Sequence, residues 1–200
     1  MKWIAQRIWP DSTVYILGGG PSLNAVPLDL IKGEHVIGIN NAYQLGDWVD
    51  VCWFGDSRWW FDFGHGKRLL KEFFGLRVCC VPRLDDHPGI KTLTRGKPLG
   101  IETRPQFVAW NRNSGGSAIN LAYHLGGRRI VLVGFDMQRV NDRANWHEDH
   151  PCPQKDPYER YRPTFSIIAK EAKALGVEIL NTAPESAITV FPTVKLEDTV

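Results

Sequence analysis

The sequence predicts an α/β domain of the doubly wound type, in which one mainly parallel sheet carries helices on both of its faces. Short apolar runs alternate with amphipathic segments along the chain. The apolar runs lack internal polar alternation, which is typical of parallel strands buried on both faces. The first run ends in three consecutive glycines before a helix-like segment. In such a fold, ligands bind beyond the carboxyl ends of the strands.

Seven apolar runs are expected to form strands. Most place Val, Ile or Leu at successive positions, and most are followed by Gly or Asn, which favour turns. In chain order the expected strands cover residues 13–17, 35–39, 49–54, 76–81, 107–110, 129–134 and 177–180. The run at 129–134, Arg-Ile-Val-Leu-Val-Gly, has the clearest strand pattern.

Amphipathic segments at 22–31, 68–74, 117–125 and 158–175 are expected to be helices. Residues 82–104 are rich in Pro, Gly, Asp, Lys and Thr and are expected to be irregular. The polar stretch 138–157 is too long for a bare connection, so we expect it to form a lid over the site. Without an internal repeat or a linker, residues 1–200 are expected to form a single Rossmann-like domain.

Bulk composition is that of an ordinary globular protein. The chain is 43% hydrophobic and 23% charged, with a formal net charge of +2. Because Lys and Arg are spread along the chain, the charge gives no support to nucleic-acid binding. The aromatic segment 59–63 is expected in the core, although a docking surface for a planar ligand or partner is the alternative. The sequence leaves open whether identical copies of the chain assemble into an oligomer.

The four cysteines are expected to be free thiols in a reducing compartment. Cys52, Cys79 and Cys80 lie in apolar, strand-like runs, and no C-x-x-C spacing joins them to Cys152. The N-terminus lacks a sustained apolar core with a cleavage site, and no stretch is long enough to span a bilayer. These features predict a cytoplasmic protein.

The glycine turn after the first expected strand is the strongest indication of function. Gly18, Gly19 and Gly20 permit a sharp turn and the close approach of a ligand. Pro21 suits a first helical position and Ser22 can cap the helix, so exposed amides there are expected to bind a phosphate. The segment is neither a dinucleotide fingerprint nor a Walker loop, and an ordinary strand-to-helix turn is the alternative.

Further polar residues follow the other expected strands. Asn40 and Asn41 follow the second strand and can each offer a donor and an acceptor to a base or a ribose. Asp56 follows the third strand, and Asp136 follows the run at 129–134. A second glycine-rich cap precedes the helix at 117–125, and its members are Ser114, Gly115 and Gly116. Turn-forming and capping roles would use the same residue types.

The expected lid contains two histidines, His147 and His150. Imidazole is suited to proton transfer near neutral pH, so either can be a general base. The two could also share a metal ion if the turn were helical, but Pro151 and Pro153 disfavour a helix there. Charges of a solvated loop are the simplest interpretation.

Several motifs together resemble those of the small bacterial sialyltransferases of glycosyltransferase family 42. The chain is similar to that family in Gly18 to Leu23, in Ile39-Asn40-Asn41, in Asn113 to Gly116 and in Arg129 to Asp136. Its end, Val177 to Asn181, is similar to the family's final strand. The same framework also resembles the archaeal-type 6-hydroxymethylpterin diphosphokinases and related flagellin-glycosylation accessory proteins.

The sialyltransferase resemblance implies that Gly18–Ser22 and Asn40 or Asn41 hold CMP, and that residues 114–116 face the activated sugar. The family uses a histidine base before its last long helix and tyrosines that bind the leaving phosphate. The corresponding candidates here are His147, His150, Tyr158 and Tyr161. The diphosphokinases carry magnesium-binding aspartates after strands two and three. This chain has asparagines after strand two, which favours the glycosyltransferase.

Three functions are therefore considered. The first is transfer of a sugar from a nucleotide-activated donor, CMP-linked in the resemblance, to an unidentified acceptor hydroxyl without a cofactor. The second is Mg²⁺-assisted diphosphate transfer from ATP to a pterin-like alcohol, with Asp56 and Asp136 as metal ligands. The third is a non-catalytic nucleotide- or glycan-binding module that docks through residues 59–63.

Overall fold

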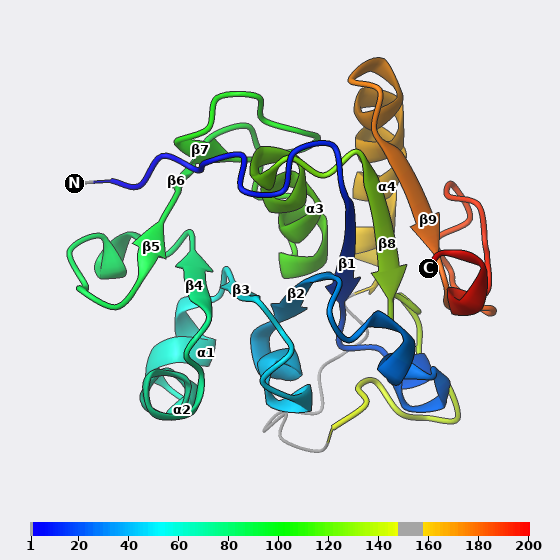
Figure 1. Cartoon of the computed structure of the whole chain (residues 1–200), viewed down its shortest axis with the longest axis horizontal. Helices are drawn as coiled ribbons and strands as arrows, with labels where there is room; N and C mark the ends of the chain where they lie inside the picture. The colour runs from blue at the N-terminus through cyan, green and yellow to red at the C-terminus, as the bar shows by residue number, and fades with distance from the viewer. Residues whose placement is uncertain (1, 148–157) are drawn as a thin grey trace.

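Seven parallel strands form the central sheet of the computed structural model, which describes residues 2–147 and 158–200 (Figure 1). Their spatial order is β5-β4-β3-β2-β1-β8-β9, and every neighbouring pair is parallel. The strands are β1 (Thr13–Leu17), β2 (His35–Ile39), β3 (Val51–Phe54), β4 (Leu76–Cys79), β5 (Lys91–Thr92), β8 (Arg129–Val133) and β9 (Glu178–Asn181). The predicted α/β class with a mainly parallel sheet is confirmed.

The direction of strand addition reverses between β1 and β8. From β1 the chain adds β2, β3, β4 and β5 on one side, and then returns to place β8 and β9 on the other side. At such a reversal the connecting segments leave toward opposite faces, which opens a crevice beyond the carboxyl ends of the two strands. The glycine turn follows β1 at this position.

Helices cover both faces of the sheet. The helices α3 (Ser114–Leu125) and α4 (Tyr158–Ala174) pack on one face, where Ile16, Ile37 and Leu132 point. The short helices α1 (Ser57–Phe61) and α2 (His65–Glu72) lie on the other face, with Leu17, Phe54 and Val133. Alternate residues of the central strands therefore serve two separate cores, which is why the sequences of β1, β2, β3 and β8 are mainly apolar.

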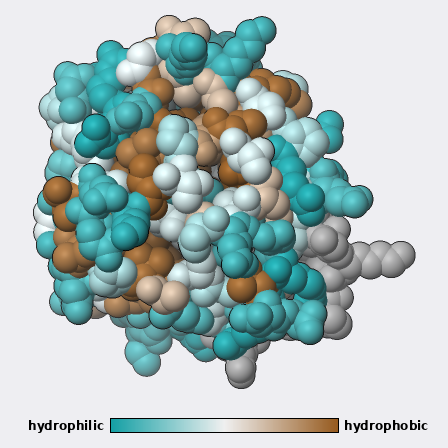
Figure 2. Space-filling model, turned by 90° about the vertical axis from the view of Figure 1, so that its right-hand side faces the viewer, coloured by the Kyte–Doolittle hydropathy of each residue, from teal (hydrophilic) through white to brown (hydrophobic). Residues whose placement is uncertain are grey.

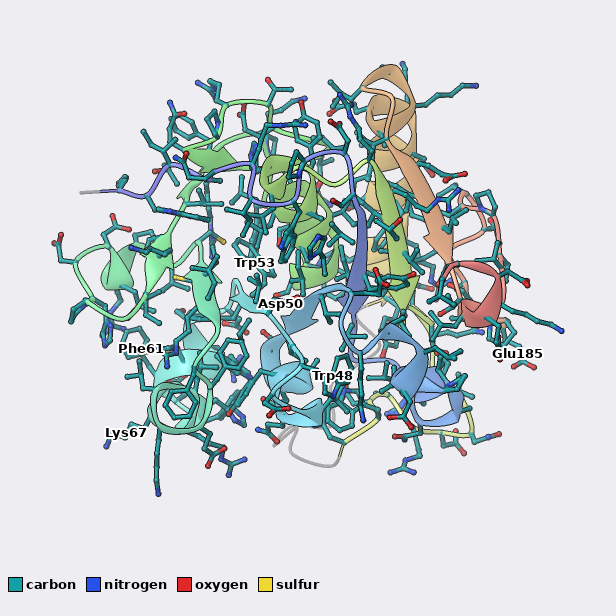
Figure 3. All side chains as sticks on the ribbon, viewed as in Figure 1. Trp48, Asp50, Trp53, Phe61, Lys67 and Glu185 are labelled. Carbon is teal, nitrogen blue, oxygen red and sulfur yellow. The ribbon has the colours of Figure 1, made fainter. Side chains whose placement is uncertain are left out.

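Trp53 connects the centre of the sheet to the start of α3. Its indole Nε1 donates to the carbonyl of Ser114 and to the hydroxyl of Ser117, each at 3.1 Å. Figure 3 shows Trp53 beside α3. Because the side chain is completely buried, these hydrogen bonds fix the first turn of α3 over β3.

The expectation that the aromatic segment at 59–63 lies in the core is met by its two tryptophans only. Trp59 and Trp60 are buried, and both rings pack on Phe54. Phe61, labelled in Figure 3, is 39% exposed. Arg83 lies over its ring. A short helix, α1, carries these residues; it was not expected from the sequence.

The predicted helix over residues 22–31 is wrong in type. The chain forms two 3₁₀ helices instead, η1 (Pro21–Ala25) and η2 (Leu28–Ile31). Pro27 lacks an amide hydrogen and forces the residue before it into extended backbone, so a continuous α-helix cannot form. Gly20, and not Ser22, occupies the N-cap position of η1.

The remaining elements lie close to their expected positions. The 3₁₀ helices η3 (Asn40–Leu45), η4 (Pro82–Leu84) and η5 (Leu196–Asp198) complete the set. The expected strand at 107–110 is only β7 (Phe107–Val108), which pairs with β6 (Thr94–Arg95) in a separate two-stranded sheet. The prediction of irregular structure over 82–104 holds apart from η4, β5 and β6.

Cys52, Cys79 and Cys80 are buried free thiols, as predicted. Burial raises the pKa of the Cys79 thiol to about 12, so it stays protonated and unreactive near neutral pH. Cys152 lies outside the described residues. None of the helices in the described part of the chain has the length and apolarity needed to cross a bilayer. Figure 2 shows a face on which small hydrophobic areas lie among hydrophilic side chains.

Candidate active site

One cavity of about 730 Å³ lies beyond the carboxyl ends of β8, β1, β2 and β3. Three strand spacings of about 4.8 Å make this edge about 14 Å wide, enough for a nucleotide and an attached group. Ten residues predicted from the sequence line it: Gly18, Gly19, Gly20, Asn40, Asp56, Ser114, Gly115, His147, Tyr158 and Tyr161. The two glycine-rich turns, near residues 20 and 115, therefore share one cavity.

The glycine turn forms a wall where β1 and β8 approach closely. The amide of Gly18 donates to the carbonyl of Val133 at 2.7 Å, and that of Gly20 to Gly134 at 2.8 Å. A Cβ atom on Gly20 would lie 1.8 Å from a carboxylate oxygen of Asp136. The glycines thus permit close packing, and, contrary to expectation, the amides of Gly18 and Gly20 bind β8 and its turn instead of facing a ligand.

The buried carboxylate of Asp136 holds this turn in place. Its carboxylate accepts hydrogen bonds from the hydroxyl of Ser22 at 2.9 Å and from the amide of Ser22 at 3.3 Å. Burial raises the pKa of Asp136, while the bonds from Ser22 act in the opposite direction. Asp136, Ser22 and Pro21 do not line the cavity. In the structure, Asp136 and Ser22 support the turn through these hydrogen bonds.

Asn40 reaches the cavity from the end of β2. Its φ of 52° is left-handed, a conformation that asparagine adopts more readily than most residues. The side-chain Oδ1 is buried and has no hydrogen-bond partner in the described part of the chain. A buried acceptor without a donor is unfavourable by about 1–3 kcal/mol, so this atom is a candidate for binding a ligand donor.

Asn41 serves the core and does not line the cavity. Its side chain is 3% exposed, and its Oδ1 accepts a hydrogen bond from the Trp59 indole at 2.8 Å. The two adjacent asparagines therefore have different environments: Asn40 lines the cavity, and Asn41 lies in the core. Because η3 begins at Asn40, the following side chain turns inward.

The start of α3 presents free amides to the cavity. Asn113 caps the helix, because its Oδ1 accepts the amide of Gly116 at 2.7 Å. Gly116 is thus occupied by the cap and does not line the cavity. The amides of Ser114 and Gly115 have no acceptor within residues 2–147 and 158–200. Together with the helix dipole they favour an anion at this end of the helix.

The buried side chain of Asn111 holds the backbone before α3 in place. Its amide group donates to the carbonyls of Gly100 and Gly116 and accepts from the amide of Gly100 at 2.7 Å. Asn111 and Arg112 both have left-handed backbone, with φ of 56° and 58°. Two such residues in succession are strained, and strain of this kind concentrates at functional sites.

The segment before α4 covers the glycine turn. The amide of Trp146 donates to the carbonyl of Gly19 at 3.0 Å, and Asn24 donates to the carbonyl of Trp146 at 3.2 Å. The His147 ring packs edge-on against the Trp146 ring, with centroids 4.9 Å apart. These contacts hold His147 at the cavity wall; Figure 1 shows the segment passing beside η1 and η2. His150 lies outside the described residues.

The two tyrosines lie one turn apart at the beginning of α4. The Tyr158 hydroxyl donates to the carbonyl of Ala144 at 3.0 Å. The Tyr161 hydroxyl accepts from Arg160 at 3.1 Å, and the Arg160 guanidinium also lies over the Tyr161 ring. Both tyrosines line the cavity on the side of the predicted lid.

Four arginines at the cavity were not predicted from the sequence. They are Arg112, Arg139, Arg143 and Arg160. Among residues 2–147 and 158–200, the acidic residues that line it with them are Asp56 and Asp142, so within this part of the chain the arginines outnumber the acids. This balance favours a ligand with more than one negative group. Their positions in the sequence could have indicated two of them as site residues. Arg112 directly precedes the cap of α3, and Arg160 lies between the two tyrosines.

The predicted pair of metal ligands does not come together. Asp56 lines the cavity and caps α1 by accepting the amide of Arg58 at 2.9 Å, but Asp136 is buried beneath the glycine turn. Among residues 2–147 and 158–200, no three His, Cys, Asp or Glu side chains lie together as metal ligands would. The residues described here do not fit a magnesium site that uses both aspartates.

The fold is similar to that of solved sialyltransferases. CstII from Campylobacter jejuni, in complex with the substrate analogue cytidine-5′-monophosphate, aligns over 92% of this chain and 85% of its own, with a TM-score of 0.58 and 16% identity. The complex with CMP-3FNeuAc aligns over 91% and 84%, with a TM-score of 0.56 and 16% identity. CST-II with a trisaccharide acceptor and CMP aligns over 90% and 84%, with a TM-score of 0.53 and 16% identity.

No protein-family model matches the chain, and no curated protein matches it at a significant level. None of the structures named above is a diphosphokinase, so that part of the resemblance has no support. At this identity the likeness establishes the fold alone. The chain has the α/β fold of the CstII sialyltransferase structures.

Proposed function

We propose that this protein transfers a sugar from a CMP-linked donor to the hydroxyl group of an acceptor. One observation carries the proposal: the glycine turn, Asn40 and the start of α3 line a single cavity at the reversal between β1 and β8. The shared fold adds support, because the similar sialyltransferases were solved with CMP and with CMP-3FNeuAc.

The nucleotide is placed over the glycine turn and β2. The unpartnered Oδ1 of Asn40 needs a donor, which an amino group of the base or a ribose hydroxyl can supply. Gly18–Gly20 carry no side chains, so a flat base or ribose can approach the backbone there. The monophosphate then extends toward the start of α3.

The leaving phosphate is stabilised by groups that are already fixed. The amides of Ser114 and Gly115 point from the start of α3, and Arg160 and Tyr161 approach from α4. When the bond between the anomeric carbon and the phosphate oxygen breaks, negative charge grows on that oxygen. Fixed donors at this point lower the barrier because they need no reorganisation.

His147 is the proposed general base. As the acceptor oxygen forms its bond to the anomeric carbon, the hydroxyl proton passes to the imidazole, and CMP leaves with the electrons of the broken bond. No step in this scheme needs a metal ion. His147 lines the same cavity and directly follows Trp146, whose amide donates to the Gly19 carbonyl, so the proposed acceptor enters from the side of residues 138–147.

A thermal-shift screen tests the proposed donor class. CMP, CDP, UDP, GDP and ATP are compared, each with Mg²⁺ and with EDTA. We expect CMP to raise the Tm most, equally in both conditions; a ligand at a hundred times its Kd stabilises by about 2.7 kcal/mol.

The opposite pattern would overturn the proposal. A shift with ATP that disappears in EDTA would indicate Mg²⁺-dependent diphosphate transfer instead. Tight binding of CMP with no transfer from any CMP-sugar to a panel of saccharides would indicate a non-catalytic binding module.

A further inference from the structure

Trp110 is the one tryptophan that lines the cavity in the described part of the chain. The roles proposed above for the glycine turns and the tyrosines do not involve it. It lies four residues before Ser114, at the end of the cavity formed by β3. The side chain is only partly buried although it packs against the core. A large aromatic ring exposed to a polar cavity is a common element of ligand sites.

Arg95 covers one face of the Trp110 ring, with the guanidinium carbon 4.0 Å from the ring centroid. The guanidinium cannot drift, because it donates to the carbonyl of Cys80 at 3.1 Å and to that of Gly55 at 2.8 Å. The Trp110 amide also donates to the carbonyl of Lys97 at 3.1 Å. The ring is therefore held on one face by Arg95, and Trp110 also lines the cavity.

Gly55 fixes the position of the ring from the side of β3. A Cβ atom on Gly55 would lie 2.3 Å from Cζ3 of Trp110, which is closer than any real contact. Any other residue at 55 would push the indole out of its place. The missing side chain at position 55 leaves room for the Trp110 ring, and the stacked Arg95 guanidinium holds it there. Together they fix the position of the ring beside Asp56.

We infer that the Trp110 indole is the stacking surface for the saccharide ring of the donor. This rests on the proposed function, which places the nucleotide over the glycine turn and the phosphate at Ser114 and Gly115. Trp110 lines the same cavity, and its ring lies against Gly55, which directly follows β3. The C–H bonds of a sugar ring carry partial positive charge and are attracted to the negative face of an aromatic ring. The cavity then has a direction, from the nucleotide at β1 and β2 to the sugar at β3.

Calorimetry with CMP and CMP-3FNeuAc tests this direction, because the two ligands differ only by the sugar. For Trp110→Leu, which keeps an apolar side chain but removes the ring, we expect the Kd of CMP-3FNeuAc to rise about tenfold and that of CMP less than about twofold. Trp110→Phe should retain most of the affinity for CMP-3FNeuAc. Gly55→Ala, which displaces the ring without removing it, should resemble Trp110→Leu. Trp48→Phe is the matched control, since Trp48 is a partly buried tryptophan outside the cavity lining (Figure 3).

The inference is overturned if Trp110→Leu binds CMP and CMP-3FNeuAc as the unaltered protein does, or if it weakens both ligands equally. If Trp110→Leu does not fold, Gly55→Ala decides by the same ratio of Kd values. If the unaltered protein binds neither ligand, the proposed function itself fails, and the inference fails with it.

Discussion

Replacing His147 by Asn is expected to lower kcat by about 10²- to 10⁴-fold, the usual contribution of a general base. Asparagine is similar in size but cannot take up a proton near neutral pH. The hydrogen bonds that hold this position are made by the backbone of Trp146 with Gly19 and Asn24, so they do not depend on the imidazole ring. The Kd of CMP should therefore change little. Initial rates of CMP release and calorimetry measure the two quantities.

His150→Asn is the matched control, because it is the other histidine that the sequence offers as a base. It should retain nearly all of the activity. If His150→Asn abolished transfer and His147→Asn did not, the base would be His150, and the position of His147 beside the glycine turn would have another purpose. Loss of CMP binding in His147→Asn would show that this residue acts in binding, not in proton transfer.

Gly20→Ala is expected to be the most damaging single-methyl change in the chain. The added Cβ would lie 1.8 Å from the Asp136 carboxylate and 2.6 Å from the carbonyl of Gly134. Both neighbours are buried, and the carbonyl belongs to the backbone, so the turn itself has to move. Overpacking of this kind lowers the free energy of unfolding by about 3 kcal/mol. Displacement of the cavity wall should also weaken CMP binding about a hundredfold.

Gly19→Ala separates this effect from a general sensitivity of the turn. A Cβ there meets only the side-chain Oδ1 of Asn145, at 3.2 Å, and that side chain is able to shift. We expect the free energy of unfolding, measured in urea, to fall by less than about 1 kcal/mol. Equal damage from Gly19→Ala and Gly20→Ala would contradict the role given to the contact with Asp136.

Most of the sheet could be predicted from the sequence because the central strands are apolar on both faces, whereas the short polar strand β5 (Lys91–Thr92) was not expected. The runs ending before Gly18, Asn40 and Gly134 are unambiguous for that reason. The helix expected after Ser22 failed because Pro27 interrupts it, and the pattern of apolar residues alone does not show whether a short segment is α or 3₁₀. The proline ring at position 27 therefore decided the type of helix in this segment.

The candidate site was predictable only in part. Residues at strand ends meet because parallel strands end at one edge, which brings Gly18–Gly20, Asn40 and Asp56 to the cavity. The sequence could not show that Asn41 binds Trp59 or that Asp136 binds Ser22, because those contacts depend on side chains distant in the chain. The arginines were missed because their positive charge becomes a cluster only when residues 112, 139 and 160 are brought together.

A crystal structure of the CMP complex tests the central claim most directly. The account predicts CMP in the cavity, with its base or ribose within hydrogen-bond distance of Asn40 Oδ1 and its phosphate at the amides of Ser114 and Gly115. CMP bound elsewhere on the protein, or a phosphate directed away from the start of α3, would contradict it.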